Sequence, residues 1–84
     1  MASFLVETYI PDADAQDPHV AGRRMRDAAR RLSREGISVR YVRTTLLPGD
    51  EMCFHVLAAD SRDAVAAACR LAGLERARIV DALE

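Results

Sequence analysis

Hydrophobic and polar residues follow one another along this 84-residue chain in a pattern that predicts four strands and two helices. Residues 3–10, SFLVETYI, are rich in β-branched and aromatic types and end at Pro11, which is typical of a strand. Residues 37–47 and 51–59 have the same character and are joined by the turn sequence PGD, which predicts a β-hairpin. Residues 76–83 predict the last strand.

The first predicted helix covers residues 18–35. Asp17 and Pro18 suit the N-cap and the first helical position, and Gly36 suits the end. The apolar face at helical spacing is formed by Val20, Met25, Ala28, Ala29 and Leu32. The remaining positions predict a solvated face rich in arginine: Arg23, Arg24, Arg26, Arg30, Arg31 and Arg34.

The second predicted helix is capped by Asp60 or Ser61, runs to about Ala72 and stops at Gly73. The resulting β-α-β-β-α-β order predicts an α+β, ferredoxin-like fold, with a four-stranded antiparallel sheet in the order 4-1-3-2 and two helices on one face. We expect residues 1–84 to form one such domain. The other sheet face stays open, and an exposed apolar face predicts that a second copy or a ligand covers it.

Alternation along the strands predicts which side chains share each face of the sheet. Because the helices need apolar partners, the helix side is assigned Phe4, Val6, Ile10, Val42, Leu46, Met52, Phe54 and Val56. The open face then collects at its centre Glu7, Tyr9, Tyr41, Arg43, Cys53 and His55. Its margins carry Leu5, Val39, Leu47 and Leu57. A three-residue PGD loop would place Leu47 opposite Glu51, His55 opposite Arg43 and Cys53 opposite Thr45. A polar centre with an apolar rim is typical of a pocket closed by a partner.

Composition excludes some classes of partner. The chain has 12 basic and 13 acidic residues, a net charge of −1 and no lysine. This balance argues against general attraction to nucleic acids or anionic membranes, and the sheet lacks the stacking aromatics of RNA-binding ferredoxin-like domains. No apolar run approaches the ~20 residues of a membrane span, and the N-terminal segment lacks a basic n-region. We therefore expect a cytoplasmic protein with no nucleic-acid or membrane partner and with two free cysteines.

Most of the chain outside the first helix resembles a small bacterial family typified by a nickel-binding, nickel-responsive actinomycete protein. The family pattern combines a "V-x-W-V-x-S-Y-V" strand, an "F-C-x-Y-x-A" strand, a capped "A-V-x-x-A-x-x-x-G-L/F" helix and a closing "I-V/x-E" strand. The matching segments here are FLVETYIP and VRYVRTTLLPGDEMCFHVLAADSRDAVAAACRLAGLERARIVDALE. The resemblance implies a ferredoxin-like fold, a homodimer, and binding of nickel or another divalent transition metal.

In this resemblance, Cys53 occupies the family's strand-three Cys and Glu7 its strand-one Glu. The chain departs from the pattern at three positions: Tyr41 replaces the family's Trp, Arg43 stands where His is frequent, and His55 stands where an aromatic follows the Cys. Because an arginine does not ligate metals, His55 would supply the imidazole from a different position.

Cys53 and His55, two residues apart in a strand, are predicted to present a thiol and an imidazole to the same face. With Glu7 they would form a ligand set suited to nickel, copper or zinc, completed by a dimer partner or by water. The predicted function is therefore a small binding protein that holds such a metal, or a small ligand, on the open face of a homodimer. Further ligand contacts are assigned to Tyr9, Tyr41 and Arg43.

Two alternatives remain open for the same residues. The pocket could belong to a small cofactor-free cyclase or isomerase, with Glu7 or His55 as general base and Tyr41 or Arg43 steadying an enolate. Cys53 could instead be a small interface residue, with His55 paired to Glu7.

Overall fold

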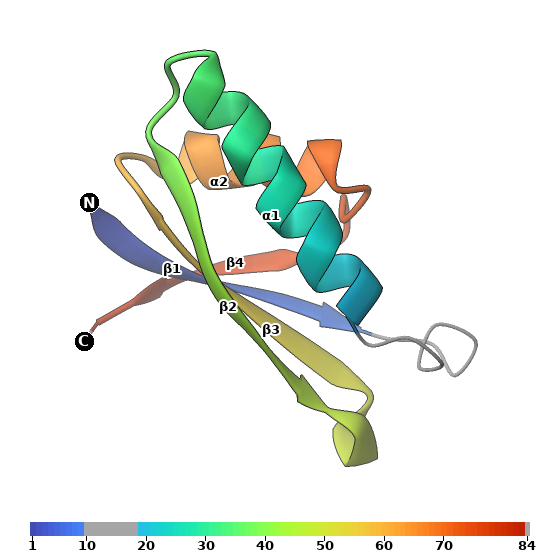
Figure 1. Ribbon diagram of the computed structural model, residues 1–84. Coiled ribbons are helices and arrows are strands. Elements are labelled where there is room, and N and C mark those ends of the chain that lie inside the picture. The colour runs from blue at the N-terminus through green and yellow to red at the C-terminus, as the bar shows by residue number, and fades with distance from the viewer. Residues whose placement is uncertain (10–18, 84) are drawn as a thin grey trace.

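The computed structural model describes residues 1–9 and 19–83 and confirms the ferredoxin-like fold (Figure 1). The elements are β1 (Ala2–Tyr9), α1 (His19–Arg34), β2 (Val39–Leu47), a 3₁₀ turn η1 (Pro48–Asp50), β3 (Met52–Ala59), α2 (Arg62–Leu71) and β4 (Arg78–Ala82). The antiparallel sheet has the predicted order, β2-β3-β1-β4, with both helices on one face. The predicted positions Ile10, Asp17 and Pro18 lie outside the described residues.

Both helices end in the same hydrogen-bonded motif, which explains the two stop glycines. After α1, Gly36 has φ 90° and the Ile37 amide donates to the Leu32 carbonyl at 3.0 Å. After α2, Gly73 has φ 76° and the Leu74 amide donates to the Cys69 carbonyl at 2.8 Å. The left-handed conformation at this position favours glycine, because glycine lacks a Cβ. Among described helices, none has the length and hydropathy needed to cross a membrane.

The start of α2 confirms one of the two predicted caps. The Ser61 hydroxyl accepts a hydrogen bond from the Ala64 amide at 3.1 Å, so Ser61, and not Asp60, is the N-cap. This bond satisfies one of the amide donors that a helix start leaves unpaired.

The hydrophobic core lies between the helices and one face of the sheet. Its largest fully buried members include Met25 from α1, Val65 from α2 and Leu57 from β3. The strands add further buried side chains: Phe4, Val6, Val39 and Ala59. The predicted apolar face of α1 is confirmed at four positions, namely Met25, Ala28, Ala29 and Leu32, whereas Val20 is only half-buried.

The predicted face of β3 is wrong. Val6 of β1, which points to the helices, pairs directly with His55, and Thr8 pairs with Cys53. Because directly opposite residues of antiparallel strands share a face, Cys53 and His55 lie under the helices. By the same rule Phe54, opposite Glu7, lies on the open face.

The turn between β2 and β3 explains part of this error. Glu51 adopts a left-handed conformation (φ 54°) after η1, so Leu47 pairs with Met52 and the loop has four residues instead of three. His55 therefore lies opposite Thr44, and Cys53 opposite Leu46.

A bulge in β2 explains the rest. The register shifts between Tyr41 and Arg43, so Val39 and Tyr41 face the helices, as Thr44 does beyond the bulge. Arg43 stays on the open face as predicted. A bulge places one extra residue in a strand and thereby reverses the alternation of faces on its two sides.

Candidate functional site

The thiol–imidazole pair of β3 is the centre of a buried polar network. The Cys53 Sγ lies 3.6 Å from the His55 Nε2, and His55 Nδ1 lies 2.7 Å from the Thr44 Oγ1. Thr44 Oγ1 in turn lies 2.5 Å from the Tyr41 hydroxyl. Cys53 and His55 have no exposed surface, whereas Tyr41 is half-buried. We call these four residues the Tyr41–Cys53 network.

The strands β2 and β3 and the helix α1 together determine where the members of this network lie. The β2 bulge turns both Tyr41 and Thr44 toward α1, and β3 supplies Cys53 and His55 at alternate positions. Gly22 of α1 packs directly over it, since a Cβ there would lie 2.9 Å from Thr44 Oγ1. Among the described residues no buried side-chain nitrogen or oxygen lacks a hydrogen-bond partner. The network thus satisfies polar groups that would be costly to bury alone.

Burial keeps the imidazole and the thiol of this network neutral. Loss of solvent lowers the pKa of His55 from 6.5 to about 4, so the ring is uncharged at neutral pH. Burial raises the pKa of the Cys53 thiol, and a hydrogen bond from Thr8 offsets this only in part. A nucleophilic cysteine needs a lowered pKa, which a charged imidazole beside it can provide. The pair therefore has the electrostatics of a core network and not of an activated nucleophile.

The open face has a different composition, which the strand register defines row by row. One row is Arg43, Val56, Leu5 and Val80; the next is Thr45, Phe54, Glu7 and Arg78. In the second row the Glu7 carboxylate lies 3.7 Å from the Arg78 guanidinium. Of the predicted site residues, Glu7, Tyr9 and Arg43 thus share the open face, and the Tyr9 hydroxyl donates to the Glu51 carboxylate.

The predicted metal-ligand set is divided between the two faces of the sheet. The 3.6 Å between Cys53 Sγ and His55 Nε2 suits two ligands of one tetrahedral ion, for which bonds of ~2.3 and ~2.1 Å imply about 3.6 Å. Glu7, however, points to the opposite face, and the described residues contain no cluster of three His, Cys, Asp or Glu side chains. Two buried ligands do not make a closed site. These residues therefore do not fit the expected metal centre as one site.

The same division affects the other predicted contacts. Tyr41, predicted to share the open-face ligand site with Tyr9 and Arg43, faces the helix side because of the β2 bulge. The proposed general base His55 is buried on the helix side, and its lowered pKa makes it a weak base. Glu7 is therefore the one predicted base on the open face.

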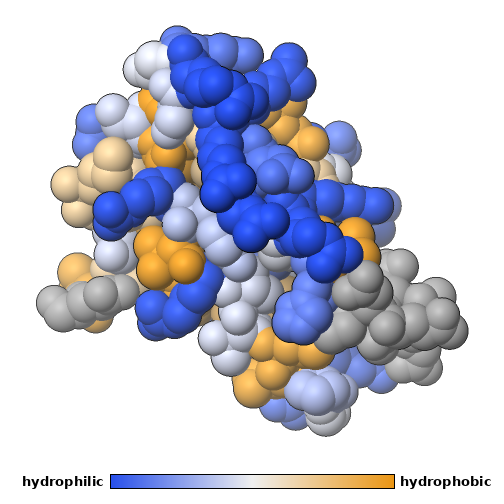
Figure 2. All heavy atoms as spheres, in the orientation of Figure 1, coloured by the Kyte–Doolittle hydropathy of each residue, from blue (hydrophilic) through white to orange (hydrophobic). Residues whose placement is uncertain are grey.

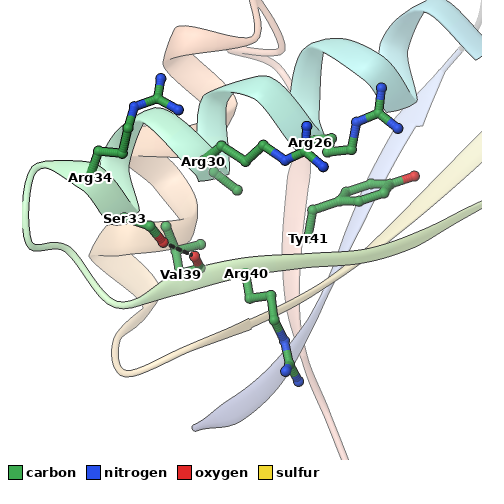
Figure 3. Close-up of a pocket in the computed structure, with 8 residues that line it drawn as sticks. Arg26, Arg30, Ser33, Arg34, Val39, Arg40 and Tyr41 are labelled. Atoms are coloured by element: carbon green, nitrogen blue, oxygen red, sulfur yellow. Dashed lines mark hydrogen bonds between the residues drawn. The ribbon is translucent and has the colours of Figure 1, made fainter.

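A second feature, which the sequence analysis treated only as a solvated helix face, is a groove between α1 and β2 (Figure 3). It has a volume of about 390 Å³ and is lined by Arg26, Ala29, Arg30, Ser33, Arg34, Val39, Arg40 and Tyr41. We call it the arginine groove. The sequence signal was the spacing of Arg26, Arg30 and Arg34, four residues apart, which aligns them along one side of a helix.

No family model matches the chain, and neither a curated protein nor a solved structure matches it significantly. The resemblance to the nickel-binding family therefore stays a prediction.

Proposed function

We propose that the protein is a small cytoplasmic binding protein that works as a homodimer, in which two open sheet faces enclose a small ligand or a divalent transition metal ion. The observation that most supports this is a charged pair set in an apolar surface. The Glu7 side chain is only 24% exposed although it lies on the open face, and its partner is Arg78. Phe54 and Leu5 occupy neighbouring positions. A small number of polar groups that converge within an apolar surface is typical of ligand sites.

The apolar part of this face supports the dimer. Its members, from three strands, are Leu5, Met52, Phe54, Val56, Ala58, Val80 and Ala82. Val56 and Ala58 are buried, and the other five are half-buried. Contiguous apolar side chains that remain partly exposed on one sheet face commonly mark an interaction site. A second copy offers the same surface and buries it from water, which is favourable for apolar side chains.

The ligand is proposed to contact Glu7. Cys53 and His55 are not available on this face, but a dimer brings a second Glu7 carboxylate to the same interface. Carboxylate oxygens accept divalent metals, and Arg43 and Arg78 supply donors for a small organic anion. The proposed ligand is thus of the predicted kind, but it contacts Glu7 in place of Cys53 and His55.

A metal titration of matched variants tests this location. Untagged protein is titrated with Ni²⁺, Zn²⁺ and Cu²⁺ as wild type, Glu7→Gln, Cys53→Ala and Cys69→Ala. Cys69 is the control because it is also a buried thiol but lies in α2. We expect Glu7→Gln to abolish stoichiometric binding and both cysteine variants to retain it. Binding that depends on Cys53, and not on Cys69 or Glu7, would contradict the open-face site. A dimer that binds none of these metals would direct the search to organic ligands.

A further inference from the structure

The arginine groove carries a charge pattern that the fold itself does not require. Arg26, Arg30 and Arg34 form a row along α1, and hydrophilic side chains make a continuous band over this helix in Figure 2. None of the three forms an ion pair with a residue in the described ranges 1–9 and 19–83. By contrast, Arg31 on the same helix pairs with Glu35 at 3.4 Å. Within those ranges the groove is thus a concentration of positive charge without ion-pair partners, on a protein whose net charge is −1.

Helix electrostatics account for only part of this row. Arg34 lies in the last turn of α1, where a cation interacts favourably with the helix dipole. Arg26 and Arg30 lie further toward the middle of the helix and gain little from that interaction. Like charges four residues apart on a helix repel each other, so the row Arg26–Arg30–Arg34 opposes folding slightly. A bound anion would remove this repulsion.

The shape of the groove suits a compact ligand. Its volume of about 390 Å³ falls within the range of small-molecule pockets. The opposite wall is β2, where the half-buried ring of Tyr41 supplies the apolar surface and Val39 is buried. The Ser33 hydroxyl of α1 donates to the Val39 carbonyl at 2.7 Å, which ties the helix to this strand. In Figure 3 the side chains of Arg26 and Arg30 extend above Tyr41, whereas that of Arg40 points away from α1. The cationic groups therefore come from the helix and the apolar surface from the strand.

Guanidinium chemistry defines the class of ligand. Each arginine presents a planar fork of donors that matches phosphate oxygens two at a time. The helical rise separates Arg26 from Arg34 by ~12 Å, so a single phosphate does not reach the whole row. We propose that the arginine groove binds a compact organic anion with two or more linked phosphate groups, the phosphates lying along the arginine row and the organic part against Tyr41. The groove lies on the helix side of the sheet, so this site is independent of the proposed function at the open face.

Binding of adenosine triphosphate tests the proposal, with pyrophosphate, citrate and a short single-stranded oligonucleotide as comparison ligands. Titration calorimetry at about 0.15 M salt compares wild type, Arg30→Gln and Arg24→Gln. Arg24 is a matched control because it is exposed on the same helix and outside the groove, and its replacement changes the net charge equally. Far-UV circular dichroism checks that both variants fold.

We expect Arg30→Gln to weaken triphosphate binding about tenfold and Arg24→Gln to change it by less than about twofold. Tighter binding of the triphosphate than of pyrophosphate would support the contact between the organic part and Tyr41; equal binding would overturn that contact. Equal losses in the two variants, or no binding of either phosphate compound at about 1 mM, would overturn the site. Citrate binding as tight as pyrophosphate would overturn the phosphate class. Arg30-dependent binding of the oligonucleotide that is tighter than that of the triphosphate would overturn the compact ligand.

Discussion

Replacing Gly22 with alanine is expected to destabilise the protein, although the same change inside a helix is ordinarily favourable. Alanine is favoured over glycine in helix interiors by about 0.5–1 kcal/mol. In α1, however, the added Cβ would lie 2.9 Å from Thr44 Oγ1 and 3.3 Å from the Tyr41 hydroxyl. Carbon and oxygen atoms do not approach so closely without displacement, so either the network or the helix must move.

The magnitude follows from what holds Thr44 in place. Its Oγ1 lies 2.7 Å from His55 Nδ1 and 2.5 Å from the Tyr41 hydroxyl. Moving it breaks a hydrogen bond to a buried ring, at about 1–3 kcal/mol. Lifting α1 instead costs about 1–3 kcal/mol, as overpacking of a core does. After the propensity gain, we expect Gly22→Ala to lower the free energy of unfolding by about 1–2 kcal/mol and the Tm by roughly 5–15 °C.

Urea and thermal unfolding, followed by circular dichroism, measure this effect. Gly49→Ala is the matched control, because a Cβ there meets no atom within 4 Å and its φ is ordinary. We expect that control to lie within about 0.5 kcal/mol of wild type. In a Thr44→Ala background the oxygen is gone, so the cost of Gly22→Ala should fall by about 1 kcal/mol. A Gly22→Ala variant as stable as wild type, or a cost unchanged in the Thr44→Ala background, would refute the close packing of α1 on the network.

Two further predictions concern the titratable groups of the core. Since burial raises the pKa of both Cys53 and Cys69, a thiol reagent should label the native protein on the order of a hundredfold more slowly than the urea-unfolded chain; equally fast labelling would show that a thiol is accessible. The pKa of His55 falls from 6.5 to about 4 on folding, so between these values the unfolded chain binds more protons and the free energy of unfolding decreases as the pH is lowered. The stability that depends on the neutral His55, at most about 3 kcal/mol, is fully present above pH 6.5 and is lost as the pH falls toward 4. This pH dependence should disappear in His55→Gln. If urea titrations at pH 7.5 and 4.5 show the same difference in free energy of unfolding for both proteins, the prediction is contradicted.

The fold was predictable because local signals agreed with one another. Alternating strands, the Ser61 cap and the glycines after each helix all pointed to the same element order, and the structure has that order. Pairs at the far end of the hairpin also follow the predicted register, with Tyr41 opposite Leu57. These features depend on short stretches of sequence, which is why sequence alone reveals them.

The distribution of residues between the faces was not predictable in the same way. It depends on whether the turn has three or four residues and on one bulge in β2. Each of these reverses the face on which the side chains beyond it lie. The assumption that the helices take the most apolar alternate set placed Phe54 inside and His55 outside. The structure does the reverse, because the buried imidazole is hydrogen-bonded to Thr44, which is itself bonded to Tyr41. A hydrogen bond from Thr44 of β2 thus makes the burial of His55 tolerable, and the sequence of β3 alone does not reveal that bond.

Sedimentation equilibrium of three proteins tests the proposed open-face dimer most directly. Wild type is compared with Leu5→Glu, which places a charge on the open face, and Leu71→Glu, which makes the same change on the exposed surface of α2. At concentrations on the order of 10 μM we expect wild type and Leu71→Glu to be dimers and Leu5→Glu to be a folded monomer. A monomeric wild type, or a Leu5→Glu variant that remains dimeric, would contradict the proposal that two open faces pack together.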